Sequence, residues 1–165
     1  MIEPTIVLTG GSTQQVSNIL GDLIERSQSL YAMLVDRKGF VLAHKEALWA
    51  PAPPALDSVA SLISGNAAAT QALAQLLGEG QFSELVQQGQ DHSLYVDGIN
   101  DLVLLVVIFD KNSAVGRVKL FAKRAVHHLD KITKEAVVNP GNLGIDSNFA
   151  ESANTLLDEL FGEDK

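Results

Sequence analysis

Three stretches of the chain repeat apolar residues every three or four positions, which is the spacing of one face of an α-helix. They run from Thr13 to Ser27, from Ala55 to Leu77 and from Val115 to Ala136. Ser12 or Thr13 is suited to cap the start of the first stretch, and Gly78 is suited to end the second. The sequence therefore predicts three amphipathic helices.

Between these helices lie five shorter stretches of strand length that are rich in apolar and β-branched residues. They are Leu30–Val35, Phe40–His44, Phe82–Gln88, Ser93–Val96 and Leu102–Phe109. The turn between the first two ends at Gly39, where we expect a positive φ, and Asp97-Gly98 predicts a hairpin between the last two. Because the connections are short, the strands are expected to pair antiparallel.

The stretch from Leu102 to Phe109 is apolar at every position, so both faces of its strand must be covered. Helices are therefore expected on both sides of the sheet. The element order predicts a mixed α/β (α+β) fold, a five-stranded antiparallel sheet in the order αββαβββα. Residues 1–138 are expected to form this domain.

The chain continues beyond this domain with a predicted linker and one more helix. Asn139–Ser147 contains proline and glycine, which is typical of a linker. Residues 148–165 are expected to form a docking helix and tail, which contact either a partner or the chain's own domain. The large apolar residues of that helix are Phe149, Leu156, Leu157, Leu160 and Phe161.

The composition agrees with one globular domain. Of the 165 residues, 46% are hydrophobic and 19% are charged, which is enough to build a core. The sequence has no cysteine, no secretory signal at its start and no apolar run of membrane-spanning length, so we expect a cytoplasmic protein without a transmembrane segment. The net charge of −8 argues against nucleic acid as the main partner.

No motif in the sequence predicts a catalytic, phosphate-binding or metal-binding site. The glycines before Thr13 lie where a phosphate loop would, but they lack its lysine. His127 and His128 are adjacent on a helix and point about 100° apart, so they cannot share a metal ion as an i, i+4 pair could. Asp36 and Asp97 are both in predicted turns, where aspartate has a local structural role. We therefore expect no cofactor, no metal site and no catalytic site.

The central helix carries an unusually smooth face. Ser61, Gly65, Ala68 and Ala72 fall on one side of it, and a glycine within a helix costs about 1 kcal/mol relative to alanine. Close packing on the chain's own sheet would explain the small residues. However, a second set of larger residues is expected to form the core face, which leaves the smooth face for self-association. This second set is Val59, Leu62, Ile63, Ala69, Leu73, Leu76 and Leu77.

Basic residues are concentrated on the third helix. Seven basic residues and one acidic residue lie between Lys111 and Lys134. Lys119, Lys123 and Arg124 crowd one part of this helix, which fits either a solvated polar face or a contact surface. A contact is favoured because like charges repel unless a partner neutralises them.

Several segments resemble the Roadblock family, most of all its bacterial polarity regulators. SLISGNAAATQALAQLLGE (61–79) is similar to the central helix of that family. DRKGFVLAHKE (36–46), LVVIFD (105–110) and VGRVKLFAKRA (115–125) match the hairpin, a strand and the last core helix. The resemblance extends over nearly the whole chain.

The resemblance implies a homodimeric regulator of a small Ras-like GTPase of the MglA type. The two chains of the homodimer together activate one GTPase. It implies a sheet with one helix on one face and two on the other, and a dimer that pairs the central helices and an edge strand. It also implies that the regulator inserts no catalytic arginine, reshapes the switch region of the GTPase, and gathers at a cell pole. The appended helix of such proteins touches the GTPase.

Particular residues take roles from this resemblance. Ser61, Gly65, Ala68 and Ala72 correspond to the dimer seam. Gln14 and Gln15, together with Lys119, Lys123 and Arg124, correspond to positions that contact the GTPase. The alternative is a scaffold of the Roadblock type, which assembles complexes without changing hydrolysis.

Overall fold

The computed structural model describes residues 4–138 and residue 155. Its core consists of α1 (Gly10–Ser27), β2 (Tyr31–Asp36), β3 (Val41–Glu46), α2 (Leu56–Leu76), β4 (Glu84–Gln88), β5 (His92–Gly98), β6 (Val103–Asp110) and α3 (Val115–Glu135). The two-residue strands β1 (Thr5–Ile6) and β7 (Val137–Val138) form a separate small sheet. Residues 6–136 form one compact unit. The predicted order αββαβββα is confirmed.

The five longer strands form one antiparallel sheet in the order β3-β2-β6-β5-β4. The two central strands pair along their length, with Leu34 opposite Leu105 and Asp36 opposite Val103. All six residues of β2 and the first five of β6 are buried. The prediction that the last strand is covered on both faces is therefore confirmed.

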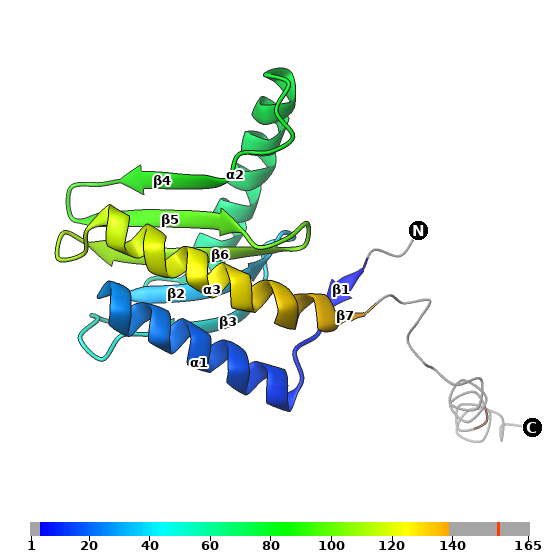
Figure 1. Ribbon diagram of the computed structural model, residues 1–165, viewed down its shortest axis with the longest axis horizontal. Helices are drawn as coiled ribbons and strands as arrows, with labels where there is room; N and C mark the ends of the chain where they lie inside the picture. The colour runs from blue at the N-terminus through cyan, green and yellow to red at the C-terminus, as the bar shows by residue number, and fades with distance from the viewer. Residues whose placement is uncertain (1–3, 139–154, 156–165) are drawn as a thin grey trace, which may run out of the picture. The chain divides into compact units, whose positions relative to one another are not determined.

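Two helices cover one face of the sheet, and one helix covers the other (Figure 1). α1 and α3 lie side by side and run antiparallel, because Arg117 Nε, near the start of α3, donates to the carbonyl of Arg26 near the end of α1 at 2.6 Å. Each buries an apolar stripe. The buried apolar residues are Val16, Leu20, Leu23 and Ile24 of α1 and Val118, Ala122, Ala125 and Leu129 of α3.

α1 begins three residues earlier than predicted. Thr9, rather than Ser12 or Thr13, is the N-cap residue, and its N–H donates to Ser12 Oγ at 2.9 Å. This contact is one half of a capping box, in which the third helical residue reaches back to the cap. Gly10 and Gly11 therefore belong to the first turn of the helix.

The predicted hairpin between the last two strands is confirmed, but its turn is not at Asp97-Gly98. Both residues lie within β5, where Asp97 pairs with Leu105 and Gly98 with Leu104 of β6. The turn comes later, at Asn100, whose side-chain oxygen accepts from the N–H of Leu102 at 2.9 Å. Asn100 also donates to Thr133 Oγ1 of α3, so a contact distant in sequence fixes this turn.

The β2–β3 hairpin is pressed against α2. Gly39 has φ +101°, as predicted, and a Cβ atom at this position would lie 3.3 Å from the Cα of Ser61. Ser64 of α2 donates its hydroxyl to the carbonyl of Arg37 in the same hairpin. Only glycine meets both the backbone requirement and the close approach.

Substituting Gly39 by alanine should lower the free energy of unfolding by about 1–3 kcal/mol, because alanine is strained at this φ and meets the α2 backbone. Chemical unfolding followed by circular dichroism measures the change. Gly116→Ala is the matched control, since nothing lies within 4 Å of an added Cβ there and its φ is not in the left-handed region. Equal stability of the two variants would contradict the packing of this hairpin.

Candidate functional site

All five residues predicted to contact a GTPase lie on the α1/α3 layer, but not in one cluster. Gln14, Gln15 and Arg124 are exposed. Gln14 donates to Asn18 Oδ1 at 3.0 Å, and Asn18 lines one groove together with Arg124 and His128 of α3. Because the helices are antiparallel, Gln14 and Gln15 lie toward the His128 end of this layer, whereas Lys119 lies toward the other end.

The two lysines of α3 are held by carboxylates of the sheet. Lys123 Nζ lies 2.9 Å from Glu84 Oε2 and 2.8 Å from Asp97 Oδ2, and Lys119 pairs with the other oxygen of Glu84. Asp97 is 3% exposed and also accepts from the hydroxyl of Tyr95 at 2.9 Å. Glu84 and Asp97 are paired residues of β4 and β5, so this network joins α3 to the edge of the sheet.

The ionisation of these groups reflects their contacts. Hydrogen bonds from Lys119 and Lys123 lower the pKa of Glu84 from 4.5 to about 2. Burial raises the pKa of Tyr95, and the charge of Asp97 adds to the effect. Burial alone would lower the pKa of Lys123, but its hydrogen bonds to Asp97 and Glu84 outweigh burial and raise it.

This network removes the main argument for the lysines as partner contacts. Two lysines face two carboxylates, so their charges are balanced within the chain. The expected repulsion that a partner would have to neutralise is therefore absent at Lys119 and Lys123. Sequence reasoning missed the pairing of Glu84 and Asp97 with the lysines, because Asp97-Gly98 carries a strong turn signal. The useful signal was the alternation of Tyr95 and Asp97, which puts both side chains on one face of β5.

Arg124 remains the best candidate for a charged contact on this layer. Its guanidinium lies over the Phe121 ring, 5.3 Å from the centroid, and it makes no ion pair with another described residue. The groove beside it is lined by Asn18, Asp22 and His128 among others. A planar cation on an aromatic ring, next to polar side chains, can bind a carboxylate of a partner.

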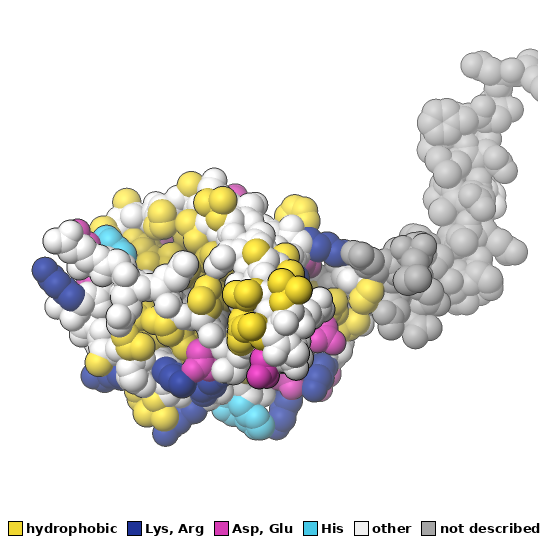
Figure 2. Space-filling view, turned by 90° about the horizontal axis from the view of Figure 1, so that it is seen from above, with side chains coloured by type: hydrophobic (Ala, Val, Ile, Leu, Met, Phe, Trp, Pro, Cys, Tyr) yellow, Lys and Arg dark blue, Asp and Glu magenta, His cyan; other side chains and the backbone are white. Residues whose placement is uncertain are grey.

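The opposite face of the domain presents α2. Ser61, Gly65, Ala68 and Ala72 are all exposed, and a Cβ at Gly65 would meet nothing within 4 Å. Packing on the chain's own sheet therefore does not explain this glycine. Figure 2 shows hydrophobic and uncharged side chains over the side where α2 lies, whereas charged side chains gather along the α1/α3 side.

The expected core face of α2 is largely wrong. Ile63 is buried and Val59 is half-buried, but the large leucines face solvent. Their exposed fractions are 75% for Leu62, 51% for Leu73, 85% for Leu76 and 65% for Leu77. The residues that α2 buries are Ala60, Ile63, Ser64 and Ala74. The leucines therefore adjoin the smooth face instead of opposing it.

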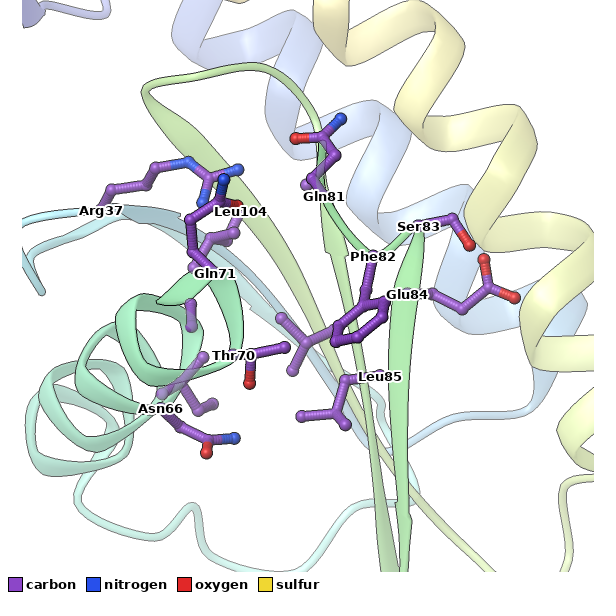
Figure 3. Close-up of a pocket in the computed structure, with 14 residues that line it drawn as sticks. Arg37, Asn66, Thr70, Gln71, Gln81, Phe82, Ser83, Glu84, Leu85 and Leu104 are labelled. Atoms are coloured by element: carbon purple, nitrogen blue, oxygen red, sulfur yellow. The ribbon is translucent and has the colours of Figure 1, made fainter. Parts of the chain in front are cut away.

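A hollow that is open to solvent lies between α2 and the β4–β5 side of the sheet (Figure 3). Leu85, Val96 and Leu104 contribute apolar surface to it, and Arg37 and Gln71 contribute polar groups. Glu84 points away from this hollow, toward α3 (Figure 3). A single helix thus leaves part of this face of the sheet uncovered.

Comparison with known proteins places these features in a family. The family model described as the Roadblock/LC7 domain matches residues 17–109. The chain belongs to the Roadblock/LC7 family. The matched range runs from α1 to β6 and leaves α3 outside it. A comparison with curated proteins finds no match.

Several solved structures resemble this Roadblock domain closely. The gliding protein MglB of Thermus thermophilus is 52% identical over 82% of this chain and 100% of its own, with a TM-score of 0.78. A structure described as MglB with tetrameric arrangement is 51% identical over 82% and 99%, with a TM-score of 0.79. MglB of Myxococcus xanthus is 31% identical over 73% and 96%, with a TM-score of 0.68.

Three further predictions for this Roadblock protein concern its tail, metal binding and a membrane segment. The tail residues Phe149, Leu156, Leu157, Leu160 and Phe161 lie outside the described residues. Among those that are described, no three side chains gather in a way that could hold a metal ion. No helix within the described residues combines the length and hydropathy that a membrane span requires.

The ion pairs of Glu84 predict a pH-dependent contribution to stability. A carboxyl whose pKa is lowered on folding stabilises the protein above its unfolded pKa of 4.5 and loses this effect as the pH falls toward about 2. Glu84→Gln should therefore be less stable than the original protein at about pH 6, and the difference should shrink by about pH 3. Urea unfolding across this range measures it.

Glu79→Gln is the control, because Glu79 is an exposed glutamate in the loop after α2. It should alter stability little at any pH. A constant difference between Glu84→Gln and the original protein over the whole range would show that the lysine pairs of Glu84 do not stabilise the fold.

Proposed function

We propose that this Roadblock protein is an MglB-like regulator that binds a small Ras-like GTPase of the MglA type and stimulates its GTP hydrolysis. The observation that carries this proposal is the 52% identity to a gliding protein MglB along the entire length of that protein. The regulator acts as a homodimer, two copies to one GTPase, in the control of cell polarity. The tail helix adds a second contact to the GTPase.

The division of the domain into two faces supports this function. The α1/α3 layer carries Gln14, Gln15 and Arg124, which are exposed for a GTPase. Gly65 and Ala68, the proposed dimer seam, belong to α2, and α2 lies on the other side of the sheet (Figure 1). Self-association and GTPase binding therefore do not compete for the same surface. Self-association is also supported by the tetrameric arrangement of a relative 51% identical to this chain.

The contacts of the arginines support a mechanism in which the regulator inserts no arginine into the nucleotide site of the GTPase. The sequence has four, and all lie in the described part of the chain. Arg26 pairs with Asp22, Arg37 donates to the carbonyl of Asn100, and Arg117 donates to the carbonyl of Arg26. Arg124 lies on an aromatic ring of its own helix. An arginine finger requires a side chain that is free to reach the nucleotide of the partner. Three of these four are held by hydrogen bonds within the domain, and Arg124 is the one left for the contact with a partner carboxylate.

Single-turnover GTP hydrolysis by an MglA-type GTPase tests the proposal. Adding this protein should accelerate hydrolysis, while the protein alone should hydrolyse nothing, because it lacks the lysine of a phosphate loop. Binding without acceleration would instead assign the scaffold function. Absence of binding would refute both.

Arg124→Glu should slow association with the GTPase by roughly tenfold and weaken its salt dependence, because it reverses an exposed charge at the contact. Stopped-flow association at several salt concentrations measures both effects. Lys111→Glu is the matched control, since Lys111 is exposed in the loop between β6 and α3. Equal rates for the two variants would exclude Arg124 from the contact.

Ala68→Arg should convert the dimer to a folded monomer, because it places a charge and several extra atoms at the seam. The substitution should not unfold the domain, since Ala68 is exposed in the single chain. Light scattering gives the mass, and circular dichroism reports the fold. A variant that remains dimeric would place the seam elsewhere.

A further inference from the structure

The edge strand β4 lacks the features that usually keep a sheet edge from pairing with another chain. Protected edges carry lysines, prolines or bulges. β4 contains no lysine and no proline, and its register with β5 is unbroken from Glu84 to Gln88. Its single charged side chain, Glu84, is turned toward α3 and held there by two lysines (Figure 3). Nothing in the strand itself therefore opposes the addition of a further strand.

Alternate residues of β4 direct their backbone groups away from β5. Gly89 donates its N–H to the carbonyl of His92 at 2.9 Å, so these two residues form a hydrogen-bonded pair at the end of the hairpin. Bonded and non-bonded pairs alternate along an antiparallel ladder. Leu85 consequently bonds to β5, whereas the N–H and C=O of Val86 point outward. No strand among residues 4–138 pairs with this outer side of β4.

The hollow between α2 and the sheet lies beside the same edge. Leu85 of β4 is half-buried in its lining, and Phe82, just before the strand, is 41% exposed. Thr70 of α2 faces them across the hollow (Figure 3). A strand added to β4 would present every second side chain on this face of the sheet. One apolar side chain of that strand would then enter the hollow next to Leu85.

Arg37 places a cation at the rim of the hollow. Its Nε and Nη2 donate to the carbonyl of Asn100, at 3.1 and 3.0 Å, which uses two of the five N–H donors of the guanidinium. A Cβ at Gly98 would lie 2.9 Å from Nη2, so this glycine makes room for the side chain across β5. Arg37 pairs with no carboxylate among residues 4–138. It is held too firmly to reach outward, but its remaining donors suit a carboxylate that is brought to the hollow.

The proposed dimer seam does not cover the hollow. Ser61, at the start of the seam, lies against the β2–β3 hairpin, because its Cα would be 3.3 Å from a Cβ at Gly39. Asn66 and Thr70, which line the hollow, lie about 140° and about 180° from Ser61 around the helix axis. The hollow therefore opens on the β4 side of α2, and the seam lies on the β3 side.

We propose that β4 and the hollow together bind an extended segment of a second partner protein. The segment adds a strand to the outer side of β4, inserts one apolar side chain beside Leu85 and places a carboxylate on Arg37. Backbone pairing supplies affinity, and the side-chain and charge contacts supply specificity. A second copy of this chain is disfavoured as the occupant, because it would bring the same cation instead of an opposite charge.

This site goes beyond the proposed function and is separate from the GTPase contacts. α1 and α3 cover the other face of the sheet (Figure 1). One dimer can therefore hold a GTPase on the α1/α3 layer and the extended segment at β4 at the same time. The regulator would then bring a further protein to the GTPase without loss of either contact.

Selection from a random library of twelve-residue peptides displayed on phage, with the full chain as target, tests the proposal. Enriched peptides should combine an apolar residue with an aspartate or glutamate and lack proline between them. Their affinity, measured by fluorescence anisotropy, should fall at least tenfold for Val86→Pro, which removes an outward N–H and is tolerated at a sheet edge. Val86→Thr is the matched control, because it keeps the N–H and the branched side chain, and it should bind normally.

Two further variants test the other contacts. Thr70→Trp fills the hollow without altering the backbone of β4 and should also weaken binding at least tenfold. Arg37→Gln should abolish the preference for an acidic peptide over the same peptide with the amide in place of the carboxylate. A role of Arg37 in folding alone would leave this preference unchanged. Circular dichroism and light scattering check that each variant keeps the fold and the mass of the original protein.

Four outcomes would overturn the proposal. They are that no peptide is enriched, that enriched peptides bind Val86→Pro and Thr70→Trp as tightly as the original protein, that the acidic preference survives in Arg37→Gln, or that Val86→Pro lowers the mass of the free protein. The last outcome would assign the edge to a second copy. The proposed function fails separately, because it is judged by GTP hydrolysis, which Val86→Pro should leave unchanged.

Discussion

The pairing of β2 with β6 is the constraint on which the rest of the structure depends. Their side chains are buried on both faces of the sheet, so helices must pack on each side. Two helices share one side, but α2 alone covers the other (Figure 1). One helix cannot cover five strands, which accounts for the hollow beside β4. No further layer packs on α2 within the described residues, so the side of α2 that faces away from the sheet is exposed to solvent. Its apolar surface is available there for other copies of the chain.

At the β4 edge of the sheet, ion pairs join α3 to the strands. β4 is an edge strand, and its first residue, Glu84, is tied to α3 by two lysines. Asp97 joins the same network from β5, where burial without a partner would be costly. The basic stretch of α3 therefore has two roles along its length. Lys119 and Lys123 fasten the helix to the sheet, whereas Arg124 lines the groove shared with α1 and is exposed to a partner.

The sequence predicts the fold where a local pattern and a tertiary requirement agree. The apolar run of β6 and the glycine at position 39 are such cases. Asp97-Gly98 is the opposite case, because its strong local turn signal is overridden by Lys123, 26 residues away, and by the turn at Asn100. The prediction that the leucines of α2 face the core is wrong for another reason. Periodicity identifies apolar positions, but in a helix with one charged residue and apolar residues on several sides it cannot show which arc faces the sheet.

This last ambiguity follows from how the protein is built. A helix that must pack on its own sheet and on other copies needs apolar residues on more than one side, so its sequence loses the contrast that marks a core face. α1 and α3 keep that contrast, because one side of each is buried and the other meets solvent or a polar partner. A loss of amphipathicity in one helix of an otherwise amphipathic domain therefore indicates an assembly surface. In this chain, that criterion selects α2.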